Sequence, residues 1–249
     1  MKKRETIEKA TAIIFAVVVW QIIAMLIDSR ILLVTPIEVA VRFSELCLEA
    51  EFWKSIAFTL IRIVCGFALG LVAGIILALL AGSIRPVRLM LWPFMTAIKA
   101  VPVASFIILC LIWIRSSNLS IIISFLMVMP VIYTNVLQGI DSTDSKMLEM
   151  CRVFNIRGYK KVLYVTLPQV KPFLLSSCAI AAGMAWKAGT AAEVIGIPSG
   201  SIGEKLYEAK IYLLTGDLFA WTLMIVLISA VFEKLFVLAL KAAYRVLED

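Results

Sequence analysis

The chain has 249 residues, of which 62% are hydrophobic and only 16% charged, and its mean hydropathy is +1.01. Soluble domains are about half apolar and about a quarter charged, so this composition places the chain in a lipid bilayer. The net charge is +7, but the basic residues lie between apolar runs, which argues against nucleic-acid binding. The sequence contains no histidine, which excludes catalytic triads, metal sites and proton relays built on that residue.

The five cysteines are scattered and form no C-x-x-C pair, so we expect neither a disulfide framework nor a zinc site. A membrane-spanning helix needs about 20 mostly apolar residues. The sequence offers six such segments: Ala10–Ile27, Ile56–Gly82, Leu89–Ile114, Leu119–Leu137, Pro172–Ala192 and Leu218–Leu240. The predicted fold is therefore all-α, a polytopic membrane protein with about six transmembrane helices.

The first apolar segment follows the basic start Met1–Arg4 and resembles a signal peptide in outline. Its apolar core is long for a signal peptide and no A-x-A cleavage site follows it, so we expect a retained helix. Residues 1–55 then form an N-terminal helix with an extracytoplasmic surface segment. Residues 56–249 form a core of five transmembrane helices.

Basic residues predict the orientation of these helices. With the N-terminus inside the cell, fourteen Lys and Arg residues fall in cytoplasmic segments and six fall outside. This distribution follows the positive-inside rule. Both termini are expected to be cytoplasmic, together with the long loop 138–171.

The second segment carries Gly66, Gly70 and Gly74 at four-residue intervals, on one face of a helix. Such a face lets another backbone approach closely. We expect close packing within one chain, with a subunit interface as the alternative.

Two lysines fall inside apolar segments, Lys99 in the third and Lys187 in the fifth. An ammonium group in the bilayer costs at least about 3 kcal/mol, so such residues usually face a cavity or a partner. One hypothesis is a polar translocation pathway that attracts an anion, near a helix bend at Pro102. The alternative is a structural role, in which the lysines pair with carbonyls freed at Pro102 or with Glu193.

The loop 138–171 is longer than the roughly 15 residues that most connections need, which indicates a function. It reads as two short helices, Ser145–Phe154 and Arg157–Thr166, with a left-handed turn near Asn155. The dipeptide Leu167-Pro168 is expected to stop the second helix before the fifth span. The first helix has an apolar edge and can fit a groove on another protein. That edge comprises Leu148, Met150, Cys151 and Phe154.

The order and spacing of this loop resemble the "EAA" loop of ATP-binding-cassette (ABC) importer permeases, E-A-A-x3-G-x9-I-x-L-P. Here E-M-C-R-V-F-N spans residues 149–155, and V-T-L-P follows nine residues later. Glu149 takes the glutamate position, Met150 and Cys151 replace the alanines, and Asn155 replaces the glycine. Leu167 and Pro168 are identical to the last two residues of the motif.

The resemblance continues outside the loop and is to the nitrate/sulfonate/taurine-type permeases. Thr35–Val39 resembles their "TPxEV" segment, and Ser55–Gly70 resembles "S-x5-R-x3-GF-x-LG" with Arg62 at the arginine position. Lys99–Ala104 resembles "RPIPPLA". Ala191–Gly203 resembles "AAEMLG-x-SSGLG" with one residue inserted.

The resemblance implies a multi-pass subunit of the bacterial-type plasma (inner) membrane, in contact with lipid. Its implied partners are a second permease copy or paralogue, two ATPase subunits and an extracytoplasmic substrate-binding protein. It implies import of a small anionic or vitamin-like solute. No G-x4-G-K-[ST] phosphate loop occurs, so we expect a non-catalytic chain without cofactors, with ATP and Mg bound by the partner ATPase.

By the same resemblance, Glu149–Phe154 docks in the ATPase, with Asn155 and Gly158 shaping the turn. The basic residues of the loop then meet acidic ATPase residues or lipid headgroups. These are Arg152, Arg157, Lys160 and Lys161.

Two rival functions remain open at this point. One is a channel or ion-coupled secondary carrier without an ATPase, for which paired repeats are typical. No clear internal repeat is present in the sequence. The other is a membrane-embedded enzyme, for which the sequence supplies no placed base or second carboxylate. Co-purification of an ATPase distinguishes the importer from both.

Overall fold

A computed structural model describes residues 2–27, 29, 31–156 and 158–248. All regular secondary structure among these residues is helical. The helices are α1 (Lys2–Ile27), α2 (Pro36–Leu46), α3 (Ala50–Ser83), α4 (Arg85–Ala100), α5 (Val103–Leu111), α6 (Ser116–Asp141), α7 (Ser145–Val153), α8 (Gly158–Lys161), the π-helical turn η1 (Val162–Thr166), α9 (Leu167–Gly196), α10 (Ile202–Ile211) and α11 (Thr215–Glu248).

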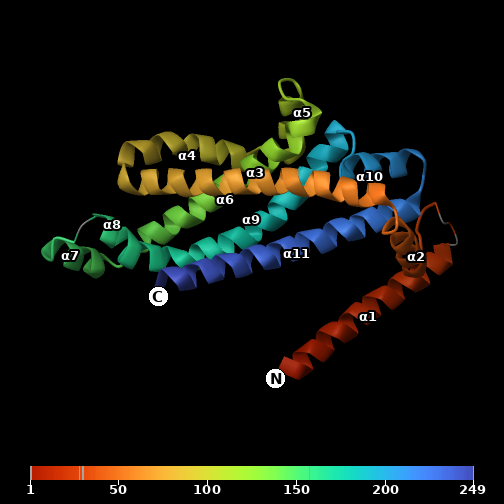
Figure 1. Cartoon of the computed structure of the whole chain (residues 1–249), viewed down its shortest axis with the longest axis horizontal. Coiled ribbons are helices and arrows are strands. Elements are labelled where there is room, and N and C mark those ends of the chain that lie inside the picture. The colour runs from red at the N-terminus through yellow and green to blue at the C-terminus, as the bar shows by residue number, and fades with distance from the viewer. Residues whose placement is uncertain (1, 28, 30, 157, 249) are drawn as a thin grey trace.

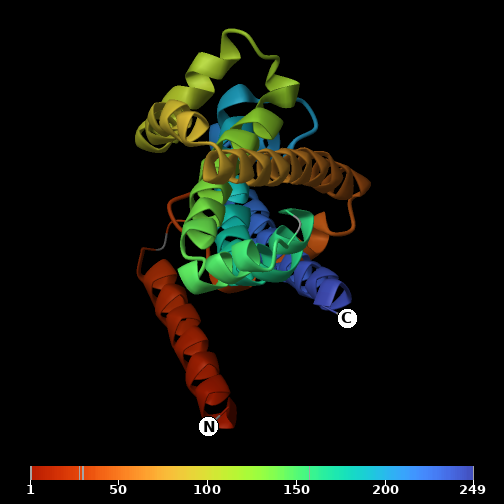
Figure 2. The ribbon, with the colours of Figure 1, turned by 90° about the vertical axis from the view of Figure 1, so that its left-hand side faces the viewer.

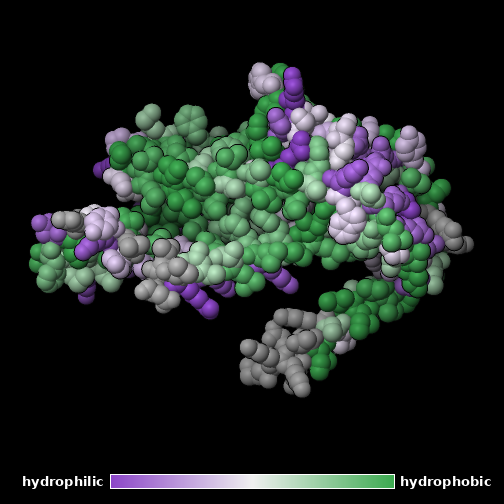
Figure 3. Space-filling model, in the orientation of Figure 1, coloured by the Kyte–Doolittle hydropathy of each residue, from purple (hydrophilic) through white to green (hydrophobic). Residues whose placement is uncertain are grey.

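Five of these helical segments are long and apolar enough to cross a membrane, and a sixth span results if α4 and α5 count as one. On the face shown in Figure 3, apolar side chains cover most of the middle of the bundle, and polar ones are most frequent toward its two ends. This is the surface expected of a polytopic membrane protein, because lipid replaces water along the sides of the helices. The predicted fold class is confirmed.

The core is a bundle in which α6 packs between α3 and α9 (Figure 1). Helices α3 and α6 run in parallel, whereas α9 runs antiparallel to α6. Ser124 of α6 donates to the carbonyl oxygen of Ala185 of α9 at 3.1 Å. The buried aromatic side chains Phe67 and Trp186 fill the space beside this bundle.

The three glycines of α3 lie directly against α6. A methyl group on Gly66 would stand 2.3 Å from the carbonyl oxygen of Ile121. The corresponding distance is 2.8 Å from Gly70 to Cβ of Val128, and 2.8 Å from Gly74 to Cβ of Ile132. The structure therefore places this glycine face within one chain, which is the packing that the spacing predicts.

The third predicted span is not one kinked helix. It consists of α4 and α5, which meet at an angle of 101°. Val101 is extended, with φ −74° and ψ 130°, because the ring of Pro102 disfavours helical geometry in the residue before it. Pro93 and Pro130 lie inside α4 and α6 without ending them.

The prediction that Leu167-Pro168 ends a loop helix is wrong. Helical structure continues from α8 through η1 into α9, and Gly158–Gly196 counts as one candidate span. The amide of Leu167 donates to the carbonyl of Val162, a bond across a π-turn. Pro168 then occupies the first turn of α9, where a missing N–H group costs least.

Helix α1 extends away from the bundle, and its tip is far from the other helices (Figures 1 and 2). Its apolar side chains, including those of Ile13, Ile14 and Phe15, are exposed. Helices α2 and α10 lie at the end of the bundle where α3 and α11 begin. Helices α7 and α8 lie at the opposite end, together with the C-terminus (Figure 1).

Candidate functional site

The loop between α6 and α9 lies at one end of the bundle (Figure 1), and apolar side chains are exposed on it. Val153 and Phe154 are 81% and 74% exposed, and Met150 is also exposed. In contrast, Cys151 and Val165 are buried and anchor the loop from within. The α7 segment therefore has one side packed inward and one side available to another protein. Arg157 lies outside the described residues, and the side-chain position of Arg152 is not described.

The turn after α7 is left-handed at Asn155, whose φ is 47°. The amide of Phe154 donates to the carbonyl of Met150 at 3.0 Å. The amide of Ile156 reaches back to the carbonyl of Cys151 at 2.9 Å. These bonds satisfy the carbonyls at the end of the helix, as a glycine-type cap does. Asn155 thus adopts the conformation that the glycine of the motif would favour.

Gln169 connects α7 to the first turn of α9. Its amide oxygen accepts from the backbone N–H of Asp144 at 3.3 Å, and its amide nitrogen donates to the sulfur of Met147 at 3.3 Å. The side chain of Asp144 accepts from the amide of Lys146 at 2.9 Å, which fixes the start of α7. Sequence reasoning did not single out Gln169. A polar residue directly after Leu167-Pro168 was the available signal.

An ion pair at the same end joins α4 to α6. Arg88 contacts Asp141 through both of its terminal nitrogens, at 3.0 and 2.6 Å. Asp141 is the last residue of α6, and α7 begins shortly after it, at Ser145. The ion pair therefore joins α4 to the segment that leads from α6 into the loop. No pattern in the sequence indicates this pair, because 53 residues separate its members.

The two lysines of the expected pathway are both exposed, on different helices. The ammonium group of Lys99 in α4 donates to Thr134 of α6, whose hydroxyl donates to the carbonyl of Pro130 at 2.6 Å. Lys187 lies on an exposed stripe of α9 that also contains Ile180 and Met184. The structure does not bring the two lysines into contact with each other.

Glu193 is buried, whereas both lysines are exposed. Its side chain is 0% exposed, and it accepts a hydrogen bond from Thr59 of α3 at 2.7 Å. Arg62, one turn further along α3, bonds instead to the carbonyl of Ser117 and lies 3.4 Å from the ring centre of Phe58. Glu193 therefore belongs to a polar contact between helices.

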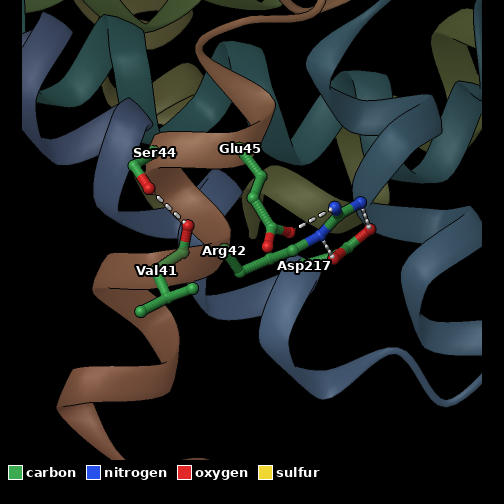
Figure 4. A network of polar contacts seen from close by, with 5 residues as sticks. All are labelled: Val41, Arg42, Ser44, Glu45 and Asp217. Atoms are coloured by element: carbon green, nitrogen blue, oxygen red, sulfur yellow. Dashed lines mark hydrogen bonds and ion pairs between the residues drawn. The ribbon is translucent and has the colours of Figure 1, made fainter.

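At the end opposite α7, ion pairs hold the surface helices together. Arg42 of α2 binds Asp217 of α11 through two nitrogens, and it also contacts Glu45 at 3.0 Å (Figure 4). The hydrogen bond to Asp217 raises the pKa of Arg42. Lys205 of α10 contacts Glu51 at 2.9 Å, and that bond raises the pKa of Lys205. Ion pairs at this end thus join α2 to α11 and α10 to the first turn of α3.

Comparison with known proteins identifies the family. The model of the family described as "Binding-protein-dependent transport system inner membrane component" matches residues 70–248. A Bacillus subtilis protein named as an aliphatic sulfonates transport permease is 29% identical over 88% of this chain and 78% of its own length. A Haemophilus influenzae protein named as an ABC transporter permease is 29% identical over 85% of this chain and 86% of its own.

A bicarbonate transport system permease of Synechococcus elongatus is 26% identical over 61% of this chain and 54% of its own length. A solved structure titled as an amino acid ABC transporter with histidines superimposes with a TM-score of 0.57. It covers 83% of this chain and 96% of its own at 20% identity, so the likeness concerns the fold. Because the family model spans well over half of the sequence, this chain belongs to the family of inner-membrane components of binding-protein-dependent transport systems.

Proposed function

We propose that this chain forms the translocation pathway of an ATP-driven ABC importer and that separate ATPase subunits drive it through the loop 138–171. The observation that carries the proposal is the distribution of exposed and buried apolar side chains on and beside α7. Met150 on α7 and Phe154 directly after it are exposed, whereas Cys151 on the other side of α7 is buried. A short helix with an apolar side and a rigid base is suited to a groove on a partner.

The contacts around α7 suit a mechanical role. Gln169 ties the helix to α9, and α6 leads into it directly. The Arg88–Asp141 pair adds α4. A push on α7 is therefore distributed to three helices of the core at once. Rigid elements with defined contacts are what transmits a displacement between sites.

We further propose that α7 and both termini are cytoplasmic. The end of the bundle that contains α7 and α8 is rich in basic residues, as the positive-inside rule requires. They include Arg85, Arg88, Lys146, Lys160, Lys161 and Lys241. The opposite end, with α2 and α10, then faces an extracytoplasmic substrate-binding protein.

The proposed solute is a small anion. Lys187 lies exposed on α9 inside the candidate span Gly158–Gly196, and no ion pair to it occurs within the described part of the chain, so its ammonium group attracts negative charge. Relatives named for aliphatic sulfonates and for bicarbonate agree with this choice. A second permease copy or a paralogue completes the pathway. ATP and Mg are bound by two ATPase subunits, which leaves this chain non-catalytic.

Affinity purification of the full chain from membranes tests the coupling. We expect an ATPase subunit to co-purify, and the purified complex in liposomes to accumulate ethanesulfonate or bicarbonate only when ATP is supplied. An ion-coupled carrier would accumulate the same probes without an ATPase and in response to an ion gradient. Recovery of a pure chain with ion-driven uptake would overturn the importer assignment.

A further inference from the structure

A buried carboxylate holds the surface helix α10 against the core. Glu193 lies in the last turn of α9 and is 0% exposed. The loop that follows α9 turns through Ile197, whose φ is 46°, and Gly200, whose φ is 82°. It brings the first residues of α10 back onto Glu193. The amide of Gly203 donates to this carboxylate at 3.4 Å.

Thr59 of α3 is the second partner, and its hydroxyl makes two bonds. It donates to Glu193 at 2.7 Å and accepts from the amide of Ile202 at 3.0 Å. Thr59 is itself 0% exposed. One hydroxyl group therefore joins three helices, α3, α9 and α10, although 134 and 143 residues separate it from its two partners.

The start of α10 packs directly against the backbone of α9 at this point. A methyl group on Gly203 would stand 2.3 Å from Cβ of Glu193 and 2.4 Å from its carbonyl carbon. The N-terminus of α10 directs the amide of Gly203 and the positive end of the helix dipole toward the carboxyl group of Glu193. Ser201 caps the same turn by accepting from the amide of Glu204 at 3.0 Å.

The carboxylate depends on these contacts. The buried hydroxyl of Ser120 on α6 also interacts with this carboxyl group, although neither that hydroxyl nor the second oxygen, Oε1, makes a hydrogen bond of normal geometry within the described part of the chain. Arg62, the nearest cation on α3, is engaged by the carbonyl of Ser117. A buried carboxyl group that loses one of its few hydrogen-bond partners is left unsatisfied at a cost, so Thr59 and the start of α10 are held in place by Glu193.

We propose that Glu193 is a positioning residue for transport, which fastens the start of α10 to α3 and α9 through Thr59. The inference rests on the proposed importer function. Under it, movement of α3 and α9 driven by the ATPase carries the extracytoplasmic surface of α10 along as part of the same rigid body. Transport then requires the contacts that join Glu193, Thr59 and α10, whereas ATP hydrolysis in the partner subunits does not depend on them.

The test uses the assembled complex with its ATPase in liposomes and the variants Thr59→Val, Thr59→Ser and Thr190→Val. Valine keeps the shape of threonine but removes both bonds, and serine keeps both. Thr190→Val is the matched control, because Thr190 is a nearby buried threonine of α9 whose hydroxyl bonds only to its own helix, at Trp186 and Lys187.

Two readouts are measured: hydrogen exchange of the peptide 199–211, and uptake of ethanesulfonate per ATP hydrolysed. For Thr59→Val we expect exchange at the start of α10 to rise at least about tenfold, because both bonds are lost. We expect uptake per ATP to fall at least about tenfold. Thr59→Ser and Thr190→Val should stay within about threefold of the wild type in both readouts, since the contacts at α10 remain.

Unchanged exchange in Thr59→Val would show that Thr59 does not attach α10 to the core. Faster exchange with an unchanged ratio of uptake to ATP would show that the attachment stabilises α10 locally but is not needed for transport. Failure of the proposed function gives a different result, since the wild-type chain would then bring down no ATPase. If the wild-type complex is ATP-driven but does not take up ethanesulfonate, the same ratio is measured with bicarbonate. If bicarbonate is not taken up either, the anion class is wrong, and the exchange readout alone decides the fastening.

Discussion

Arg88 and Asp141 form a two-pronged ion pair that joins the first turn of α4 to the last residue of α6. The two contacts measure 3.0 and 2.6 Å, and the side chains are 46% and 44% exposed. An exposed pair of this kind contributes little to stability, because water and salt screen it. It joins α4 to the segment that leads into α7 without dominating the stability of that contact.

We therefore predict a small energetic effect from breaking this pair. The variants Arg88→Gln and Asp141→Asn and their combination form a double-mutant cycle. The coupling free energy of unfolding should be about 0.2–1 kcal/mol and should decrease in 0.5 M salt, about the level at which surface ion pairs are screened. Thermal unfolding in detergent measures it. A coupling energy above about 3 kcal/mol, insensitive to salt, would show that the pair is shielded from water in the membrane environment.

The glycine face of α3 allows a matched pair of substitutions. Gly66→Ala places a methyl group 2.3 Å from the carbonyl oxygen of Ile121, so α3 and α6 must separate. We expect a loss of about 1–3 kcal/mol in the free energy of unfolding. Gly183→Ala on α9 meets no atom within 4 Å and should be neutral or stabilising by up to about 1 kcal/mol. Equal effects of the two substitutions would contradict the parallel packing of α3 on α6.

Local features of the fold were predictable from the sequence, whereas long-range contacts were not. The four-residue spacing of glycines and the left-handed preference of Asn155 are properties of single segments. The partners of Arg42 and Thr59 lie 175 and 134 residues away, and no pattern in one sequence specifies them. The π-turn before Pro168 is also invisible, because it changes the backbone geometry without a characteristic residue.

The exposed residues of α7 should determine binding to the ATPase. We predict that Phe154→Ala weakens association by about 2 kcal/mol, or about 30-fold, since an exposed aromatic residue that enters a groove dominates binding. Its exposure means that the fold is unaffected. Phe94→Ala on α4, whose side chain is 66% exposed, is the control and should leave association unchanged. Co-purification at graded detergent and salt concentrations gives the comparison.

Asn155 separates conformational from contact effects in the same loop. Asn155→Gly should bind the ATPase as the wild type does, because glycine adopts a φ of 47° without strain. Asn155→Val should destabilise the left-handed turn by about 1–2 kcal/mol and weaken ATPase binding, because a branched side chain disfavours the left-handed region. Circular dichroism and ATPase binding of the two variants are compared. Normal binding by Asn155→Val would show that the turn is not required.

The residues at the motif alanines are not equivalent in the structure. Met150 is exposed and Cys151 is 4% exposed. Met150→Ala should change the affinity for the ATPase and leave stability unaltered, whereas Cys151→Ala should lower stability because it leaves a small cavity. Thermal unfolding and ATPase binding are measured on both variants. If neither property changes in either variant, the idea that these residues are tailored to a particular ATPase fails.

Lys187 provides the test of the pathway. Its side chain is exposed on α9, so Lys187→Met should fold and should assemble with the ATPase. We predict at least about tenfold slower uptake of an anionic probe such as ethanesulfonate, because the positive charge that offsets the cost of bringing an anion into the membrane is lost. Lys187→Arg keeps that charge and should retain most of the uptake. Lys99→Met removes a lysine that is already bonded to Thr134, so we expect a smaller effect. Uptake at the wild-type rate by Lys187→Met would place this residue outside the pathway, and an equal loss in Lys187→Arg would show that shape, rather than charge, matters there.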